Sequence, residues 1–274
     1  MYYRDFGSWM REIFPFKVQK ISINAGFTCP NRDGRISSGG CTFCDNRTFN
    51  PSYCHPQQSI TRQLEDGKLF FGRKYPEMRY LAYFQAYTNT YASLPRLQAL
   101  YEEALAVSDV VGIVIGTRPD CVSDTLLDYL QSLTRHTFVM VEYGVESAND
   151  TTLRRINRGH TFACSQDAIR RTHDAEESLR QAPLISDLPI DVLKLHQLQI
   201  VKGTRLAEDY IAHPFPLYDI DDYLDLIVKY IRIVRTDMVY DRFVSQCPPE
   251  LLIAPRWGVK NYQFTEKLNK RLSR

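Results

Sequence analysis

Residues 25–44 read AGFTCPNRDGRISSGGCTFC, and this stretch decides how the rest of the chain is interpreted. It follows a strand-like run at Val18–Asn24 and places three cysteines, Cys29, Cys41 and Cys44, on a glycine-rich loop. A structural zinc ion needs four closed ligands, whereas a [4Fe–4S] cluster held by three thiolates leaves one iron open for another ligand. The spacing therefore favours an iron–sulfur cluster on this loop.

Three other interpretations of these cysteines stay open at this point. Cys54, followed by His55, could complete a four-ligand zinc site, although zinc ribbons usually pair two C-x-x-C knuckles and this chain has one. The thiols could also be small buried apolar residues. Finally, Cys41 and Cys44 could form a redox pair, which would leave Cys29 without a role.

The bulk composition is that of a soluble globular protein. The chain has 274 residues, 44% of them hydrophobic and 24% charged, with a formal net charge of +2. This mildly basic balance neither requires nor excludes a nucleic-acid partner. The N-terminus has no secretory signal pattern, and no run approaches the ~18 apolar residues of a membrane span. With seven cysteines, an odd count, we expect reduced thiols in a cytoplasmic protein without membrane attachment.

Strand-like runs alternate with helical ones, the pattern of βαβ units in a parallel sheet. The expected strands are Val18–Asn24, Arg79–Ala86, Val110–Thr117, Phe138–Glu146, Val192–Val201 and Arg242–Ser245. The expected helices are Ser59–Lys74, Pro95–Val107, Ser123–Leu133, Phe162–Asp174 and Tyr218–Arg235. We therefore expect one barrel-like α/β domain over residues 18–245, with an N-terminal extension (1–17) and a C-terminal extension (246–274).

Alternation along the strands predicts which side chains share a face. On the strand at 138–146, Val139, Val141, Tyr143 and Val145 form an apolar face for helices, while Glu142, Gly144 and Glu146 face the barrel interior. Lys194 and His196 share a face of their strand, as do Tyr83, Gln85 and Tyr87. Five strands end in polar residues, and in barrel enzymes that rim carries the catalytic groups.

The chain resembles the radical S-adenosylmethionine (radical SAM) superfamily. More closely it is similar to the YhcC-like family, and through it to the radical-SAM domain of the Elongator catalytic subunit. The motifs that carry the resemblance are the cysteine loop, YLAYFQAYT (80–88), GTRPD (116–120), EYGVES (142–147), RINRGH (155–160), VKGT (201–204), and LLIAP with Trp257-Gly258 near the C-terminus.

The resemblance implies a partial (βα)6 TIM-like barrel of radical SAM type, with a [4Fe–4S] cluster on Cys29, Cys41 and Cys44. SAM would chelate the fourth iron, and its one-electron cleavage would supply a 5′-deoxyadenosyl radical that abstracts hydrogen from a substrate. The expected cofactor-binding residues are Gln85, Tyr87, Thr88, Glu146, Ser147, Arg158, Lys194 and His196. Cys54, Cys121, Cys164 and Cys247 are expected to stand apart as structural thiols. The resemblance names no catalytic residue.

The resemblance also implies partners. A reductant such as flavodoxin or ferredoxin would supply the electron, and the Elongator similarity suggests tRNA as substrate. A basic tail with aromatic neighbours could contact RNA, although a solvated C-terminal helix explains it as well: Lys267, Lys270, Arg271, Arg274, Trp257 and Tyr262. Two alternatives are a small-molecule or protein substrate bound over Lys194, His196 and Lys202, and a non-enzymatic zinc-binding interaction domain.

One departure from the family pattern follows the helix expected at Phe162–Asp174. Family members have a strand there that helps to hold adenine, whereas here Ala175 is followed directly by a helical pattern that begins at Glu176. A skipped strand would leave the backbone groups of its neighbours unpaired. Either part of the SAM pocket is lost or the sequence omits a segment. We favour omission, and then expect a Cα separation far above the ~3.8 Å of a trans peptide between Ala175 and Glu176, or between another consecutive pair up to Ala182.

Overall fold

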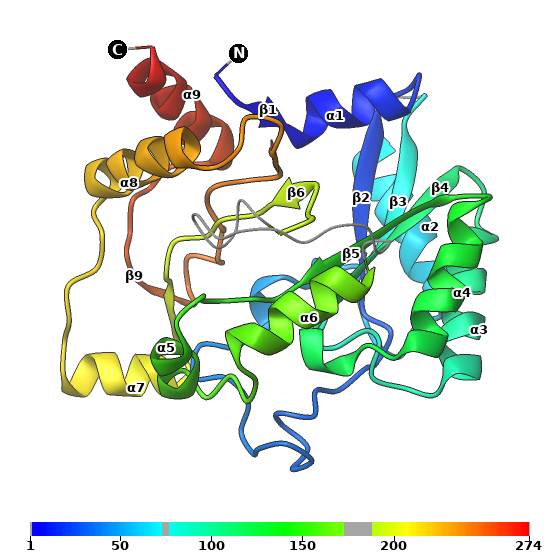
Figure 1. The fold of residues 1–274 in the computed structure, drawn as a ribbon, viewed down its shortest axis with the longest axis horizontal. Coiled ribbons are helices and arrows are strands. Elements are labelled where there is room, and N and C mark those ends of the chain that lie inside the picture. Colours follow the sequence, from blue (N-terminus) through cyan, green and yellow to red (C-terminus); the bar gives the residue numbers. More distant parts are fainter. Residues whose placement is uncertain (1, 73–76, 173–187, 274) are drawn as a thin grey trace. The chain divides into compact units, whose positions relative to one another are not determined.

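The computed structural model describes residues 2–72, 77–172 and 188–273 (Figure 1). It divides into two compact units. Unit 1 comprises Met1–Ile13, Thr42–Thr48 and Glu176–Arg274, and unit 2 comprises Phe14–Cys41 and Phe49–Ala175. The domain boundaries expected from the sequence therefore stay a prediction, and each unit is described by itself.

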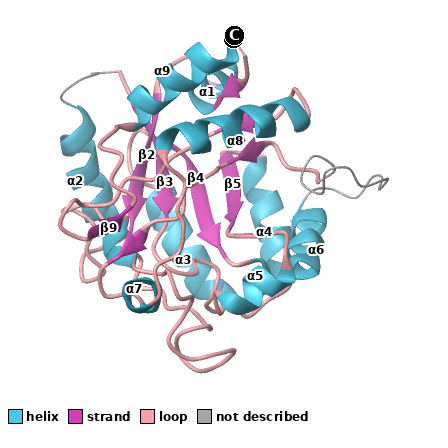
Figure 2. Ribbon diagram, turned by 90° about the vertical axis from the view of Figure 1, so that its left-hand side faces the viewer, coloured by secondary structure: helices cyan, strands magenta, loops and turns pink. Residues whose placement is uncertain are grey.

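Unit 2 is built on a four-stranded parallel sheet with the strands in sequence order (Figure 2). The strands are β2 (Val18–Ile23), β3 (Arg79–Phe84), β4 (Val110–Thr117) and β5 (Phe138–Tyr143). Parallel neighbours need crossover connections, and helices provide them here. Because every strand runs the same way, the carboxyl ends of all four meet at one edge, where the cysteine loop also begins.

Helices of unit 2 cover one face of this sheet. They are α2 (Ile60–Gly72), α3 (Leu94–Leu105) and α4 (Asp124–Thr134), which share one core with the sheet. Two further helices, α5 (Asp150–Arg155) and α6 (Phe162–Thr172), follow β5. Ser123 caps α4 by accepting a hydrogen bond from the Leu126 amide, and Pro95 lies in the first turn of α3. Fully buried Ile21, Phe84 and Tyr101 lie in the core between sheet and helices. Burying each such side chain stabilises the fold by about 1.5–3 kcal/mol.

Unit 1 collects the two ends of the chain around a second core. Its helices are α1 (Phe6–Ile13), α7 (Arg205–Ala212), α8 (Ile220–Ile233) and α9 (Asn261–Leu272). Its strands are short: β1 (Arg4–Asp5), β6 (Val192–Leu193), β7 (Ile200–Val201), β8 (Val239–Tyr240) and β9 (Leu252–Ala254). They form a parallel sheet in the order β1-β8-β6 and an antiparallel pair β7-β9. Helices α8 and α9 pack on each other through Tyr223, Leu224, Phe264 and Leu268.

The predicted α/β class with a parallel barrel-type sheet is confirmed. The strand predicted at Val110–Thr117 has the predicted bounds, and the helices predicted at Pro95–Val107 and Ser123–Leu133 are present within two residues at each end. The prediction that Val139 and Val141 pack against the helix-side core is also confirmed.

Three strand predictions are wrong. The strand predicted to reach Glu146 ends at Tyr143, because the Gly144 carbonyl accepts a hydrogen bond from the Arg158 side chain. The run Val192–Val201 is interrupted and contributes two separate two-residue strands, β6 and β7, to different sheets. Arg242–Ser245 is not a strand, and the last parallel strand is β8.

The expected Cα gap between Ala175 and Ala182 lies outside the described residues. Among the residues that are described, no helix has the length and apolar character needed to cross a membrane.

Candidate functional site

The cysteine loop is anchored where β2 ends. The buried Asn24 amide donates to Gln63 Oε1 at 2.9 Å, and Gln63 Nε2 donates back to the Asn24 carbonyl at 3.0 Å. A tight turn follows at Cys29, whose carbonyl accepts hydrogen bonds from the amides of Arg32 and Asp33. Gly40 has φ +82°, and a Cβ there would lie 2.9 Å from Arg32 Cγ, so glycine is required at this close approach.

Cys41 is buried and lies among hydrogen-bond donors. Asn31 donates through Nδ2 and Arg158 through Nη1 to the Cys41 sulfur, each at 3.5 Å. Cys29 and Cys44 are half-buried, and all three thiols are free of disulfides. A guanidinium and an amide aimed at a buried sulfur stabilise a thiolate, which is the form that binds iron. The surroundings of Cys41 within unit 2 therefore suit a thiolate ligand of an iron–sulfur cluster, while Cys44 belongs to unit 1.

Several buried polar atoms beside this loop have no hydrogen-bond partner among the described residues. They are Asn31 Oδ1, Thr88 Oγ1, Asn89 Oδ1 and Arg118 Nη1. Leaving such an atom unpaired costs about 1–3 kcal/mol, so a concentration of them needs an explanation. A bound polar group at the carboxyl ends of β2, β3 and β4 would provide one.

Arg118 is the one charged side chain among these four residues and is almost fully buried, with only 2% of the residue exposed. Its Nε and Nη2 donate to the two carboxylate oxygens of Asp120 at 2.8 and 2.7 Å. Burial alone would lower the pKa of Arg118, but the Asp120 carboxylate outweighs burial and raises it. The sequence analysis did not include Arg118 in its site, although the motif GTRPD contains it.

The sheet face opposite the helices carries a polar network. Lys20 Nζ from β2 lies 2.9 Å from Glu142 Oε1 of β5, and the Tyr83 hydroxyl donates to Glu142 Oε2 at 2.6 Å. The Ser22 hydroxyl donates to Gln85 Oε1 at 2.9 Å. Sequence reasoning placed Glu142, Tyr83 and Gln85 on this face but missed Lys20 and Ser22, which alternate with apolar residues in β2.

The Arg158 side chain contacts several of the residues predicted for the site. Besides Cys41, its guanidinium donates to the Gly144 carbonyl at 2.6 Å and lies 3.7 Å from the Glu146 carboxylate. Its Nε donates to His160 Nε2 at 2.9 Å. Burial and the neighbouring Arg158 charge lower the pKa of His160. The imidazole is therefore neutral and can accept this hydrogen bond.

Other predicted cofactor contacts lie at the same edge of the sheet. Glu146 is largely exposed and has φ +65°, so it lies beyond the strand on which it was placed. Tyr87 also has a positive φ, of 64°, and Thr88 is 1% exposed with its amide donating to the Thr28 carbonyl. The Ser147 hydroxyl accepts from the Asn149 amide.

Lys194 and His196 belong to unit 1. Lys194 Nζ lies 3.7 Å from Asp241 Oδ2, and Arg242 Nε donates to His196 Nε2 at 2.9 Å. Because residues 194–199 form no strand, the argument that these two side chains share a strand face is wrong. Their part in cofactor binding stays a prediction.

The zinc interpretation finds no support in the described part of the chain, where no three His, Cys, Asp or Glu side chains are grouped to hold one metal ion. Cys54 lies in the helix-side core, donates to Gln63 Oε1, and has its pKa raised to about 12 by burial. A neutral core thiol of this kind is a poor metal ligand. The expected convergence of Cys29, Cys41 and Cys44 on one cluster is likewise not among the groups found in the described residues and stays a prediction.

Both halves of the chain match models of known protein families. Residues 28–178 match the model of the radical SAM superfamily, and residues 190–274 match the model of the Radical_SAM C-terminal domain. The chain is 34% identical to protein YhcC of Escherichia coli K12, over 98% of this chain and 91% of YhcC. It is 33% identical to the uncharacterized protein YtqA of Bacillus subtilis, over 98% of this chain and 89% of YtqA.

More distant relatives agree. Elongator complex protein 3 of Saccharomyces cerevisiae is 26% identical over 50% of this chain and 28% of its own length. An archaeal Elp3 from Methanocaldococcus infernus with an N-terminal deletion matches in structure with a TM-score of 0.61 and 15% identity, over 93% of this chain and 62% of that one. At this identity the match shows the fold alone.

Proposed function

The chain belongs to the radical SAM superfamily, whose members are generally enzymes that use a [4Fe–4S] cluster and SAM, and we propose that it is such an enzyme itself. Cys29, Cys41 and Cys44 would hold the cluster. When bound and reduced, the two cofactors supply a 5′-deoxyadenosyl radical that abstracts hydrogen from a substrate. The residues of this chain would orient the cofactors and the substrate and exclude water from them.

One observation carries this proposal. The Arg158 guanidinium contacts the Cys41 sulfur on one side and the Gly144 carbonyl on the other, with Glu146 at 3.7 Å. Cys41 is an expected cluster ligand, and Glu146 is an expected SAM contact. A single buried cation therefore connects the two expected binding regions, which supports adjacent cofactors.

The polar sheet face has a distinct role in this proposal. Gln85, Tyr87 and Thr88 follow β3 and would contact the methionine end of SAM, whereas Glu146 and Ser147 would contact its ribose and carboxylate region. On the same sheet, Glu142 pairs with Lys20 and accepts a hydrogen bond from the Tyr83 hydroxyl. Preorganised polar groups of this kind orient a cofactor without further ordering cost. Lys194 and His196 are proposed as additional contacts.

The proposed substrate class is tRNA, because of the similarity to the Elongator catalytic subunit. The C-terminal tail adds no support, because its side chains are engaged in unit 1: Trp257 stacks on Phe264 and donates to the Tyr218 carbonyl, and Arg271 pairs with Asp221 and Asp225. These side chains stabilise unit 1. A small-molecule or protein substrate is the alternative.

Anaerobic purification with iron and sulfide counting tests the cluster, and 5′-deoxyadenosine release after reduction with SAM tests the activity. We expect about four irons per chain and a broad visible absorbance that disappears in Cys29→Ala, Cys41→Ala and Cys44→Ala. Cys54→Ala is the matched control and should keep the absorbance, because Cys54 is a neutral core thiol. A colourless protein that carries zinc and no iron would refute the proposal.

A further inference from the structure

We propose that the arginine-bearing outer surface of the cysteine loop is the docking site for an acidic one-electron carrier protein. This inference rests on the proposed function, since it names the surface through which the cluster receives its electron. It concerns residues of unit 2 only.

Three exposed arginines on this surface each lie against an aromatic ring. Arg32 lies 5.7 Å from the Tyr87 ring centroid, Arg35 lies 5.7 Å from that of Tyr91, and Arg96 lies 5.9 Å from that of Phe27. Stacking on a ring restrains a guanidinium while its charge stays in water. Arginine and tyrosine are also enriched in protein interfaces.

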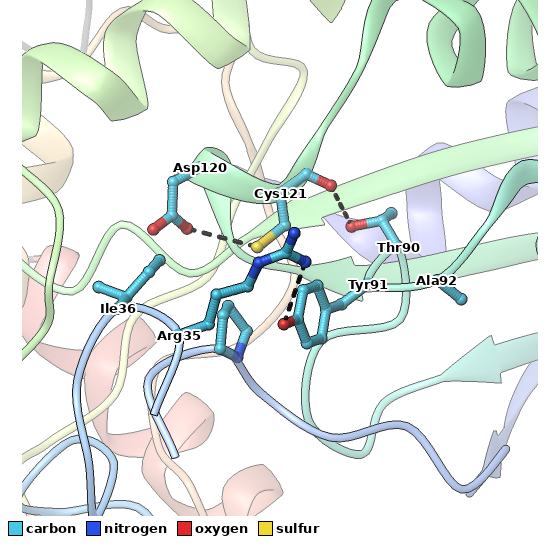
Figure 3. Close-up of a pocket in the computed structure, with 8 residues that line it drawn as sticks. Arg35, Ile36, Thr90, Tyr91, Ala92, Asp120 and Cys121 are labelled. Atoms are coloured by element: carbon cyan, nitrogen blue, oxygen red, sulfur yellow. Dashed lines mark hydrogen bonds between the residues drawn. The ribbon is translucent and has the colours of Figure 1, made fainter. Parts of the chain in front are cut away.

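Arg35 and Tyr91, one of these three pairs, line a cavity of about 420 Å³ (Figure 3). Arg35 extends across it toward Tyr91 and Cys121, and its Nη1 donates to the Tyr91 hydroxyl at 3.4 Å. Pro30, Ile36 and Ala92 give the cavity apolar walls, and Ile36 is 44% exposed. A small apolar centre bordered by charge is typical of weak redox encounters, which bury less area than stable complexes.

The charge of this surface is positive. Asp120 lines the cavity, but its carboxylate is bound by both Arg118 nitrogens and its charge is cancelled there. Asp33 is exposed and balances one of the three arginines. The excess positive charge attracts an acidic partner and speeds its diffusional encounter.

The surface is also directly connected to Cys29. Pro30 is the next residue, and the exposed Arg32 and Asp33 donate their amides to the Cys29 carbonyl at 2.8 and 3.1 Å. Ala92 packs against the helix-side core, whereas the polar network for cofactor and substrate lies on the other face of the sheet. Of the three arginine–ring pairs, Arg35–Tyr91 and Arg96–Phe27 use no residue that is proposed to contact SAM, so the electron donor would approach through these two.

The proposed step moves one electron and no atoms. The reduced carrier loses one electron, the oxidised cluster gains it, and no bond or proton is transferred. An RNA partner could also use arginines and aromatic rings. The connection to Cys29 on the helix side favours the electron carrier, and RNA binding here is an outcome that the test separates.

The test uses the full chain with its cluster assembled and a reduced flavodoxin of net negative charge as the probe. Stopped-flow absorbance measures the bimolecular rate of cluster reduction over a range of ionic strength. For the double variant Arg35→Glu/Arg96→Glu we expect at least a ~10-fold slower reduction at low salt and a weakened salt dependence. Arg32 is left in place because its side chain packs on Gly40.

Arg135→Glu is the matched control, with the same charge change at an exposed position at the C-terminal end of α4. It should keep the wild-type rate, and reduction by dithionite should be equal in all three proteins. A double variant that is reduced by flavodoxin at the wild-type rate overturns the docking site. A double variant that is still reduced at the wild-type rate but no longer binds tRNA also overturns the docking site.

Binding of oxidised flavodoxin to the chain without its cluster separates this inference from the proposed function. A chain that assembles no cluster refutes the proposed function. Flavodoxin binding that is lost in the double variant and kept in Arg135→Glu would still support the docking surface.

Discussion

At the scale of single residues, Arg158 has the largest share in the proposed site. It is 7% exposed and holds the Cys41 sulfur, the Gly144 carbonyl and the His160 ring at once. Only the planar, multiply donating guanidinium can satisfy three acceptors in different directions. Its charge also favours any state in which the neighbouring sulfur is more negative.

This charge yields a prediction for the cluster. Arg158→Gln should lower the midpoint potential, because the reduced cluster is the more negative form and loses a charged donor. A hydrogen bond to a charged group contributes about 1.5 kcal/mol. At about 59 mV per 1.4 kcal/mol for one electron, the fall should be up to about 60 mV. A redox titration followed by electron paramagnetic resonance measures it.

Arg158→Lys is the control for that experiment. It keeps the positive charge without the three-way contact, so the potential should fall less than in Arg158→Gln. Equal potentials in wild type and Arg158→Gln would show that the guanidinium does not act on the cluster.

His160 predicts a pH dependence of stability. Its pKa in the folded chain is lowered below the ordinary value of 6.5, with burial as the main cause. At pH values well above 6.5 the His160 ring is neutral in both the folded and the unfolded chain, so the free energy of unfolding does not depend on it. As the pH falls below 6.5 the unfolded chain binds the proton first, so the free energy of unfolding decreases.

Urea unfolding of the full chain at several pH values between 5 and 7.5 measures this effect. His160→Gln, whose amide oxygen can still accept from Arg158, should show a shallower fall than the wild type. Parallel pH profiles for the two proteins would mean that other groups cause the acid sensitivity.

Sequence reasoning found part of this site. Motif resemblance indicated Arg158 and Glu146, and strand alternation indicated Glu142 and Gln85. It missed Arg118, because a buried arginine is recognised only when its burial is known. It also missed Lys20, whose partner Glu142 is 122 residues away in the chain.

At the scale of elements, prediction was accurate where propensity and packing agree. β4 is a continuous apolar run buried between two neighbouring strands, so its pattern and bounds coincide. The prediction of one strand at Val192–Val201 is wrong because side-chain hydrogen bonds there take the place of backbone bonds between strands. Gln197 accepts from the Ser245 amide and donates to the Ser245 carbonyl, and Gln199 donates to the same carbonyl. Alternation cannot reveal such side-chain pairing.

Close packing within the sheet gives a prediction at this scale. A Cβ on Gly112 of β4 would lie 2.4 Å from the Phe138 carbonyl oxygen of β5 and 2.7 Å from its Cβ. Backbone cannot move aside as a side chain can, so Gly112→Ala should destabilise the chain by about 2 kcal/mol. Gly116→Ala, where the nearest atom is 3.2 Å away, should cost less. Chemical denaturation compares them, and equal costs would contradict the predicted strand contact.

At the scale of the whole molecule, the comparison with YtqA bears on the adenine-binding strand that the sequence pattern does not show after Phe162–Asp174. The alignment with YtqA runs over 287 positions, although this chain has 274 residues. YtqA therefore carries residues within the aligned region that this chain does not have. The sequence pattern after Phe162–Asp174 is where we expected an adenine-binding strand and found none.

If this chain has truly lost the adenine-binding strand and the additional YtqA residues form it, SAM binding should be weaker here than in YtqA. Losing one adenine contact of about 1.4 kcal/mol corresponds to a tenfold rise in Kd, so we expect a Kd about tenfold higher for this chain. Equilibrium dialysis of both proteins, each with its cluster assembled anaerobically, measures the affinities. Iron counting on the same samples controls for cluster content, because SAM would bind through the open iron. If the two affinities are equal at equal iron content, the residues that YtqA carries in addition do not form part of the SAM pocket.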